Sequence, residues 1–237
     1  MPRGDHDWEI VASREPFFGV VGFDDFRMSR LDAAARERFY ASGEDDVARI
    51  LSFFDADIGA RPAGRALDFG CGVGRLTRAI AGVIDHVVGY DVAPSMLGLA
   101  REVAPANVTL TTEFPAGPFD WINSFIVFQH IPPAEGLLLI DRCLAATAPG
   151  AFLSLQVTGW REGKQPSRAL HAVAARWLER RMHRRRGASA DPLIRMYDYN
   201  FSEILQRLAR HGFERVTLRH TRHGEHHGAW FVARRTG

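Results

Sequence analysis

Short apolar runs alternate with amphipathic segments along most of this chain. Five of the runs have the length and apolar character of strands, and they cover residues 66–69, 86–91, 108–112, 120–127 and 152–157. Apolar residues at helical spacing fill most of the intervals, over residues 76–83, 94–104 and 133–148. Strands and helices that alternate with short joins predict an α/β fold built on a doubly wound, mostly parallel sheet.

The C-terminal part continues this pattern and then changes it. Residues 201–211 form a helical segment that Gly212 ends, and strands follow at residues 215–221 and 230–234. The turn between these strands, at residues 223–228, is so short that the strands must be antiparallel. We therefore expect a seven-stranded sheet that finishes in an antiparallel hairpin.

The first 60 residues lie outside the alternation. The pattern turns helical at Leu31 and is interrupted at Ser42-Gly43. Ser42, followed three residues later by Asp45, is typical of the N-cap of a second helix. Residues 1–60 are therefore predicted to form an N-terminal helical cap.

A second segment, residues 159–196, interrupts the main domain, residues 61–237, as a helical insertion. Its helix, from about Ser167 to Arg185, is apolar on one face and arginine-rich on the other. A run of charge usually marks a solvated face. The alternative is an anion site for a phosphate, a carboxylate or RNA, which would suit an anionic acceptor.

Composition bounds the class of protein. The 237 residues are 46% hydrophobic and 24% charged with a net charge of +2, which excludes a wholly disordered chain and gives little support for a nucleic-acid partner. Cys71 and Cys143 lie too far apart in sequence to suggest a disulfide framework or a cysteine-based zinc site. The N-terminus lacks the apolar run of a signal peptide, and no apolar run is long enough to cross a bilayer. We therefore expect a cytoplasmic protein without a membrane partner.

The segment from Asp68 to Gly74 reads Asp-Phe-Gly-Cys-Gly-Val-Gly and joins a strand to a helix. Its glycines permit a tight turn and the close approach of a ligand to the backbone. The G-x-G-x-G spacing differs from the G-x-G-x-x-G of dinucleotide sites, and the carboxylate of Asp68 would repel a pyrophosphate. A ligand with a cationic group fits this loop better, and a tight turn without any ligand is the alternative.

Asp91 ends the second strand of the pattern. A carboxylate at that place can accept hydrogen bonds from both ribose hydroxyls of an adenosine. No arginine follows closely, which argues against a 2′-phosphate. The alternative role of Asp91 is to cap the helix that begins at Pro94.

Together these features resemble the class I S-adenosylmethionine-dependent methyltransferases. The resemblance covers residues 66–157 and 201–235, and its motifs are Asp68–Gly74, Tyr90-Asp91, Phe119-Asp120 and the C-terminal hairpin. It implies that S-adenosyl-L-methionine is the methyl donor and that the sheet ends, as in that family, with a helix and an antiparallel hairpin. A nicotinamide-linked oxidoreductase, which the loop spacing disfavours, is the alternative from another enzyme class.

The resemblance also assigns cofactor contacts. The backbone at Gly70, Cys71 and Gly72, in the loop that Gly74 completes, would line the methionine part and the sulfonium. Asp68 would hold the α-amino group, directly or through water. The remaining contacts would be Asp91 at the ribose, Val92 and Met96 near the adenine, Glu113 or Phe114 in the adenine loop, and Ser124 and Phe125 beside the methionine part.

Two residues are candidates for chemistry at the acceptor. His130 follows the fourth strand, at the carboxyl edge where open sheets bind ligands, and a free imidazole titrates near neutral pH. Its alternative role is structural, at the start of the helix near Pro133. Tyr40, in the cap, is placed by the resemblance near the methyl group, although an aromatic at helical spacing is more often part of a core. A base is needed only if the acceptor arrives protonated.

Histidines surround the last turn, but they lack the cysteine or carboxylate framework of a metal centre, apart from Glu225, so we expect no metal site. These histidines are His220, His223, His226 and His227.

Our hypothesis from the sequence is methyl transfer from S-adenosyl-L-methionine to a hydroxyl or amine of a small molecule, such as a sugar or a natural product. RNA methylation and a binding module without transfer activity are the alternatives.

Overall fold

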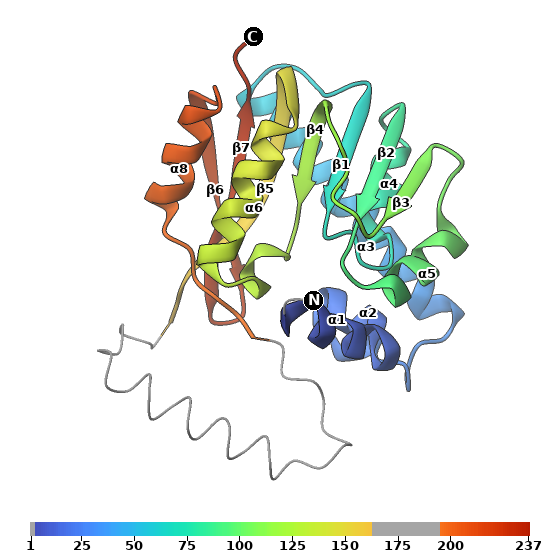
Figure 1. The fold of residues 1–237 in the computed structure, drawn as a ribbon. Coiled ribbons are helices and arrows are strands. Elements are labelled where there is room, and N and C mark those ends of the chain that lie inside the picture. Colours follow the sequence, from blue (N-terminus) through green and yellow to red (C-terminus); the bar gives the residue numbers. More distant parts are fainter. Residues whose placement is uncertain (1–2, 163–194) are drawn as a thin grey trace.

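The computed structural model describes residues 3–162 and 195–237, which form a seven-stranded sheet with helices on both faces (Figure 1). The strands are Arg65–Phe69 (β1), His86–Tyr90 (β2), Val108–Thr111 (β3), Phe119–Ser124 (β4), Thr147–Arg161 (β5), Arg215–His223 (β6) and His226–Arg234 (β7). Their spatial order is β3, β2, β1, β4, β5, β7, β6. Strands β1 to β5 are parallel, whereas β7 is antiparallel to both β5 and β6. The predicted α/β fold with its C-terminal antiparallel hairpin is confirmed.

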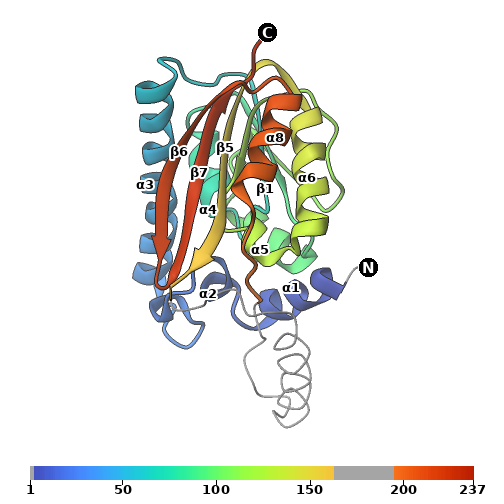
Figure 2. The same ribbon diagram turned by 90° about the vertical axis from the view of Figure 1, so that its left-hand side faces the viewer.

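Two layers of helices enclose the sheet (Figure 2). One layer contains α3 (Ala33–Asp57) and α4 (Arg75–Ala81), and the other contains α6 (Pro133–Ala145) and α8 (Phe201–Arg210). Helix α5 (Pro94–Val103) connects β2 to β3. Strand β1 contributes to both cores, because successive residues of a strand point to opposite faces of the sheet.

Helix α3 is continuous through Ser42 and Gly43, where the sequence pattern predicts a break. Its N-cap is Asp32, whose side chain accepts a hydrogen bond from the N–H of Ala35 (2.7 Å). The Ser42 hydroxyl donates to the carbonyl of Phe39 (2.7 Å) inside the helix and therefore caps nothing. Packing of α3 along the sheet and on α4 outweighs the weak helix propensity of these two residues.

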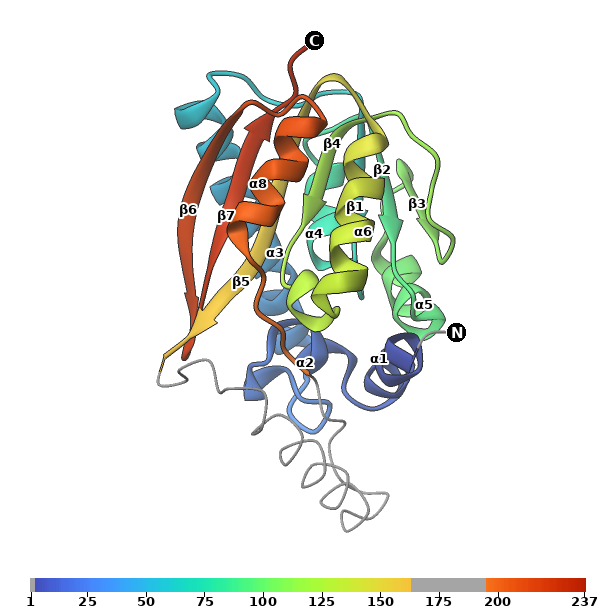
Figure 3. The ribbon, with the colours of Figure 1, turned by 60° about the vertical axis from the view of Figure 1, so that its left-hand side comes forward.

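Within the predicted helical cap of residues 1–60, the sequence pattern delimits no individual helix before Leu31. The structure has α1 (Arg3–Arg14), α2 (Pro16–Val21) and the 3-10 turn η1 (Asp24–Phe26) there. Helices α1 and α2 lie across the carboxyl ends of the strands (Figures 1 and 3). Their apolar residues pack with the start of α3 and with α5. Helix α1 is mostly polar and α2 is only six residues long, which explains why the hydrophobic pattern does not single them out.

The C-terminal hairpin is longer, and its turn tighter, than the sequence pattern predicts. Strand β5 continues to Arg161, so that residues 159–161 belong to the sheet. Only Gly224 and Glu225 separate β6 from β7, and Gly224 has a φ of 61°, which suits a two-residue turn.

The predicted insertion helix from Ser167 to Arg185 lies outside the described residues. Across the helices that the structure describes, none has the length and apolarity to cross a membrane.

Candidate functional site

A pocket of about 280 Å³ lies at the carboxyl edge of the sheet, the edge at which open α/β sheets bind ligands. Loops that follow β1, β2 and β4 line it, together with Trp8 of α1 and Gly19 and Val20 of α2. Two carboxylates, Asp91 and Glu135, contribute to its wall, and none of the lining residues in the described part of the chain is lysine or arginine. The pocket is therefore largely apolar, and the charged side chains in its described wall are acidic.

Three glycines shape the loop after β1. Gly70, Gly72 and Gly74 have φ values of 76°, 52° and 82°, a region that favours glycine. A Cβ atom on Gly70 would lie 2.4 Å from a methyl carbon of Val127, so a larger residue would clash there. The N–H of Gly70 donates to the carbonyl of Tyr90 (2.8 Å), which ties the loop to the end of β2. The turn itself requires the glycines, and Gly70 and Gly72 also line the pocket.

Asp91 stands between the loops that follow β1 and β2. Its Oδ2 accepts a hydrogen bond from the N–H of Gly72 (2.8 Å) and its Oδ1 from the N–H of Ala93 (2.9 Å). It does not cap α5, whose N-cap residue is Ala93 and which has no side-chain cap. Burial raises the pKa of Asp91, and the two N–H donors oppose that rise. Each oxygen keeps a lone pair for a further donor from the pocket.

Asp68 lies beneath the loop and is not among the residues that line the pocket. The Thr77 hydroxyl donates to its Oδ2 (2.6 Å) and the amide of Asn123 donates to its Oδ1 (2.8 Å). The network continues to Ser154, whose hydroxyl donates to the Asn123 carbonyl oxygen (2.8 Å). Burial raises the pKa of Asp68, and both hydrogen bonds oppose the rise. Asp68 therefore connects β1 with α4 and β4 at the back of the site. The sequence signal for this network is the presence of polar residues, Asn123 and Ser154, within the otherwise apolar strands β4 and β5.

The other predicted cofactor residues divide into two groups. Val92, Met96 and Phe125 line the pocket. Five predicted residues do not line it, namely Cys71, Gly74, Glu113, Phe114 and Ser124. Among these, the Phe114 ring packs behind that of Tyr90, with centroids 5.8 Å apart, and Tyr90 itself lines the pocket.

Several pocket residues do not stand out in the sequence pattern, among them Trp8, Ile126 and Glu135. Trp8 comes from α1, whose sequence is mostly polar. Ile126 immediately follows the predicted contact Phe125, in the turn after β4. Glu135 lies in the first turn of α6, at the carboxyl edge, and its place after the double proline is the signal that could have found it.

His130 lines the pocket, and both of its ring nitrogens have partners. Nε2 lies 3.1 Å from the amide nitrogen of Gln129, and Nδ1 lies 2.9 Å from the carbonyl oxygen of Arg195. An amide nitrogen only donates, so this network assigns the proton of the ring to Nδ1. The Thr158 hydroxyl fixes the orientation of Gln129 by donating to its carbonyl oxygen (2.9 Å). Burial lowers the pKa of His130 to about 4, so the ring is neutral at pH 7.

Tyr40 is buried where α2 packs on α3 and is not among the pocket-lining residues. Its hydroxyl donates to the carbonyl of Val73 (3.4 Å), in the glycine loop. Its ring packs edge-on against those of Phe17 and Phe39. Burial raises the pKa of the phenol. In this structure Tyr40 is a core residue that contacts the loop from behind.

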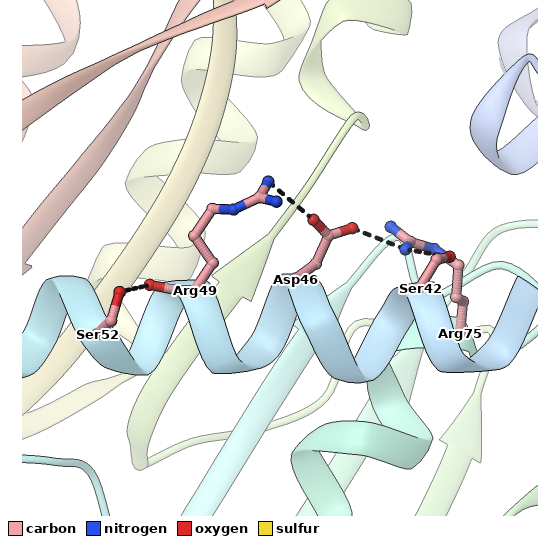
Figure 4. Close-up of polar contacts among 5 residues, drawn as sticks. All are labelled: Ser42, Asp46, Arg49, Ser52 and Arg75. Carbon is pink, nitrogen blue, oxygen red and sulfur yellow. Dashed lines mark hydrogen bonds and ion pairs between the residues drawn. The ribbon is translucent and has the colours of Figure 1, made fainter. Parts of the chain in front are cut away.

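An ion-pair cluster joins α3 to the start of α4, directly after the glycine loop (Figure 4). The guanidinium of Arg75 donates to Asp46 (2.7 Å) and to the Ser42 hydroxyl (3.1 Å). Figure 4 shows Asp46 between Arg75 and the more exposed Arg49, which lies 3.3 Å from it. Arg75 is 3% exposed, so its pairing with Asp46 matters for stability and holds the first residue of α4 in place.

Two histidines of the hairpin, His220 and His227, contact each other. His220 Nε2 lies 2.9 Å from His227 Nδ1, and His227 Nε2 lies 2.9 Å from a carboxylate oxygen of Glu162. The His227 ring also stacks on Trp160, with centroids 5.1 Å apart. Within the ranges that the structure describes, no group of three or more histidine, cysteine or acidic residues is arranged to hold a metal ion.

Comparison with known proteins places the chain in a family. A family described as "Methyltransferase domain" matches residues 33–218. Trans-aconitate 2-methyltransferase of Variovorax paradoxus (strain S110) is 34% identical over 149 residues, which are 59% of this chain and 56% of that protein. The ubiquinone biosynthesis O-methyltransferase of Xanthomonas campestris pv. campestris (strain B100) is 30% identical over 133 residues, which are 51% of this chain and 53% of that protein. The chain spans about half the length of the curated relatives it matches.

Solved structures share the fold. Magnesium protoporphyrin IX methyltransferase from Synechocystis PCC 6803, with bound SAH, has a TM-score of 0.59 and 19% identity, over 94% of this chain and 98% of that one. An amino pentose methyltransferase from Micromonospora echinaspora, with bound SAM, has a TM-score of 0.55 and 20% identity, over 87% of this chain and 98% of that one. At these identities the likeness concerns the fold alone, whereas the family match covers most of the chain. By that match and by its Rossmann-like sheet, the chain belongs to the class I S-adenosylmethionine-dependent methyltransferases.

Proposed function

We propose that this protein transfers a methyl group from S-adenosyl-L-methionine to a hydroxyl or amine of a small molecule. The observation that carries the proposal is the carboxylate of Asp91 at the wall of the pocket. The N–H of Gly72 holds it in place, and both of its oxygens keep acceptor capacity. That arrangement suits the two hydroxyls of a ribose.

The rest of the pocket fits a cationic nucleoside. Val92 and Met96 offer apolar surface for an adenine, and Gly70 leaves the loop backbone open to a ligand. Two carboxylates and the absence of lysine and arginine from the described lining residues suit a sulfonium and oppose a pyrophosphate. This charge pattern gives no support to a nicotinamide-linked oxidoreductase. The bound donor would supply an activated methyl carbon, and the protein has to hold the acceptor in line with it and exclude water.

The relatives support a small acceptor. Their names refer to trans-aconitate and to ubiquinone biosynthesis, which are small-molecule chemistries. A sugar or natural-product hydroxyl or amine is our proposal for this chain. Because aconitate is a tricarboxylic acid, an anionic acceptor is compatible with the family. The guanidinium of Arg75 lies 5.6 Å from the centre of the Phe125 ring, but it is paired with Asp46 and does not line the pocket, so it offers no free charge to such an acceptor.

The contacts of His130 favour a role in shaping the acceptor side of the pocket. To accept a proton, Nε2 would have to give up the amide of Gln129, and its pKa of about 4 makes it a weak base at pH 7. Tyr40 would have to leave Val73 and the surrounding aromatic rings to approach a ligand. Positioning by the pocket walls is therefore the contribution to catalysis that this geometry supports best.

Calorimetry with S-adenosylhomocysteine tests the proposal. The wild-type protein is expected to bind it, and Asp91→Ala is expected to weaken binding by roughly 2 kcal/mol or more, because two hydrogen bonds to a charged acceptor are lost. Asp85→Ala is the matched control, since Asp85 is an exposed carboxylate at the opposite end of β2. Absence of binding to the wild type, or equal affinity in Asp91→Ala, would overturn the proposed function.

A further inference from the structure

Ile126 has an unusual backbone conformation for a branched residue. Its φ is 60°, and within residues 3–162 and 195–237 it is the single non-glycine residue with positive φ. A β-branched side chain disfavours this left-handed region strongly, because Cβ crowds the neighbouring carbonyl. Such a conformation persists only where the surroundings impose it, and it occurs most often at functional sites.

Gln156 of β5 contacts the backbone of Ile126. Its side-chain oxygen accepts a hydrogen bond from the N–H of Ile126 (3.1 Å), and its amide nitrogen lies 3.5 Å from the hydroxyl of Thr221 on β6. Gln156 is 1% exposed and does not line the pocket. Strand β5 lies between β4 and β7 (Figure 3). Gln156 therefore contacts the turn after β4 from the neighbouring strand.

The residues on either side of Ile126 are fixed as well. The Phe125 ring stacks on Trp230, with centroids 4.7 Å apart, and Trp230 is the cross-strand partner of Gln156. Val127 packs against Gly70 of the glycine loop, where a Cβ would clash with it. Three consecutive residues after β4 thus line one pocket. A continuing strand would not allow this arrangement, because neighbouring side chains of a strand point to opposite faces.

We propose that Gln156 is a positioning residue for methyl transfer. It does not line the pocket, but its side-chain oxygen keeps Ile126 in the left-handed conformation. That conformation sets the pocket wall formed by Phe125, Ile126 and Val127. The inference rests on the proposed function, because it assumes that the cofactor binds against this wall.

A double-mutant cycle tests the proposal, because glycine adopts a φ of 60° without help. Gln156→Met keeps the side-chain length and removes the acceptor. In the wild-type background it is expected to weaken S-adenosylhomocysteine binding about tenfold by calorimetry. In the Ile126→Gly background the same change is expected to weaken binding by less than about twofold, since no conformation then has to be held. Equal effects of Gln156→Met in both backgrounds would overturn the inference.

Two further variants separate this role from general packing. Gln156→Glu keeps an oxygen acceptor at the same distance along the chain and is expected to bind S-adenosylhomocysteine within about twofold of the wild type. Ser154→Ala removes another buried polar group of β5, one that bonds Asn123 instead, and its effect should be the same in both backgrounds.

The outcomes also cover loss of folding. If Gln156→Met does not fold but Gln156→Met combined with Ile126→Gly does, the rescue supports the proposal. If neither variant folds, Gln156 is needed for folding in general and not for the conformation of Ile126, and the proposal is wrong. If wild-type protein fails to bind S-adenosylhomocysteine, the proposed function fails. If it binds normally and the cycle is additive, only this inference fails.

Discussion

The surroundings of His130 decide its chemistry more than its position in the sequence does. The sequence places it at the carboxyl edge of the sheet, where a titrating imidazole would be a natural base. The fold surrounds it with Gln129, the carbonyl of Arg195 and the edge of the Trp8 ring. Gln129 is the adjacent residue, but Trp8 comes from α1 and Arg195 from a segment far along the chain, so local sequence could not reveal these two partners.

The lowered pKa of His130 predicts a pH dependence of stability. Its pKa is about 4 in the folded protein and 6.5 in an ordinary chain, so between these values the unfolded chain binds the proton and the folded protein does not. The free energy of unfolding should therefore fall as pH drops from about 6.5 to 4, by up to about 3 kcal/mol from this group. Urea unfolding at pH 7 and pH 4.5 measures the change. In His130→Asn the drop should be smaller by that amount, and an unchanged drop would show that another group causes it.

Asp91 and Asp68 show what determines whether a residue's role can be predicted. Asp91 lies at a strand end beside the glycine loop, so its place at the pocket follows from local pattern and sheet geometry. The partners of Asp68 are Thr77 of α4 and Asn123 of β4. The orientation of the Asp68 carboxylate depends on these long-range contacts, which cannot be predicted from the sequence pattern around Asp68.

At the scale of elements, the contact between α3 and α4 explains a glycine that looks like a helix break. A Cβ on Gly43 would lie 2.3 Å from the carbonyl oxygen of Arg75, so glycine permits the close approach of the two helices. The ion pair between Asp46 and Arg75 lies one turn further along the same face (Figure 4). The sequence shows that Gly43 has a low helix propensity. It does not show that α4 comes close at this position and that glycine is needed there for that reason.

Substitution of two helical glycines tests this account. Gly43→Ala should destabilise the protein by about 2 kcal/mol or more, because the clash with the backbone of α4 outweighs the gain in helix propensity. Gly98→Ala is the matched control in α5, where a Cβ would meet nothing within 4 Å, and it should be neutral or stabilising by up to about 1 kcal/mol. Thermal or urea unfolding of both variants gives the comparison. A Gly43→Ala protein as stable as Gly98→Ala would show that α3 and α4 are not held at this distance.

At the scale of the whole molecule, the sheet brings residues from distant parts of the chain to one edge. The strand and helix alternation predicts the sheet, its hairpin and the loops that meet at the carboxyl edge. Helices α1 and α2 line the pocket through Trp8 and Val20. The sequence predicts a helical cap but not these two helices, because α1 is mostly polar and α2 is only six residues long. The segments that carry a strong period were predicted, and those that depend on tertiary packing were not.

We propose that S-adenosyl-L-methionine binds at this edge with its ribose on Asp91. A crystal structure of the protein with S-adenosylhomocysteine measures this most directly. We predict both ribose hydroxyls within hydrogen-bond distance, about 2.5–3.0 Å, of the Asp91 carboxylate, and the homocysteine part against Gly70 and the wall at Ile126. A ligand bound elsewhere, or a ribose that does not contact Asp91, would contradict the account.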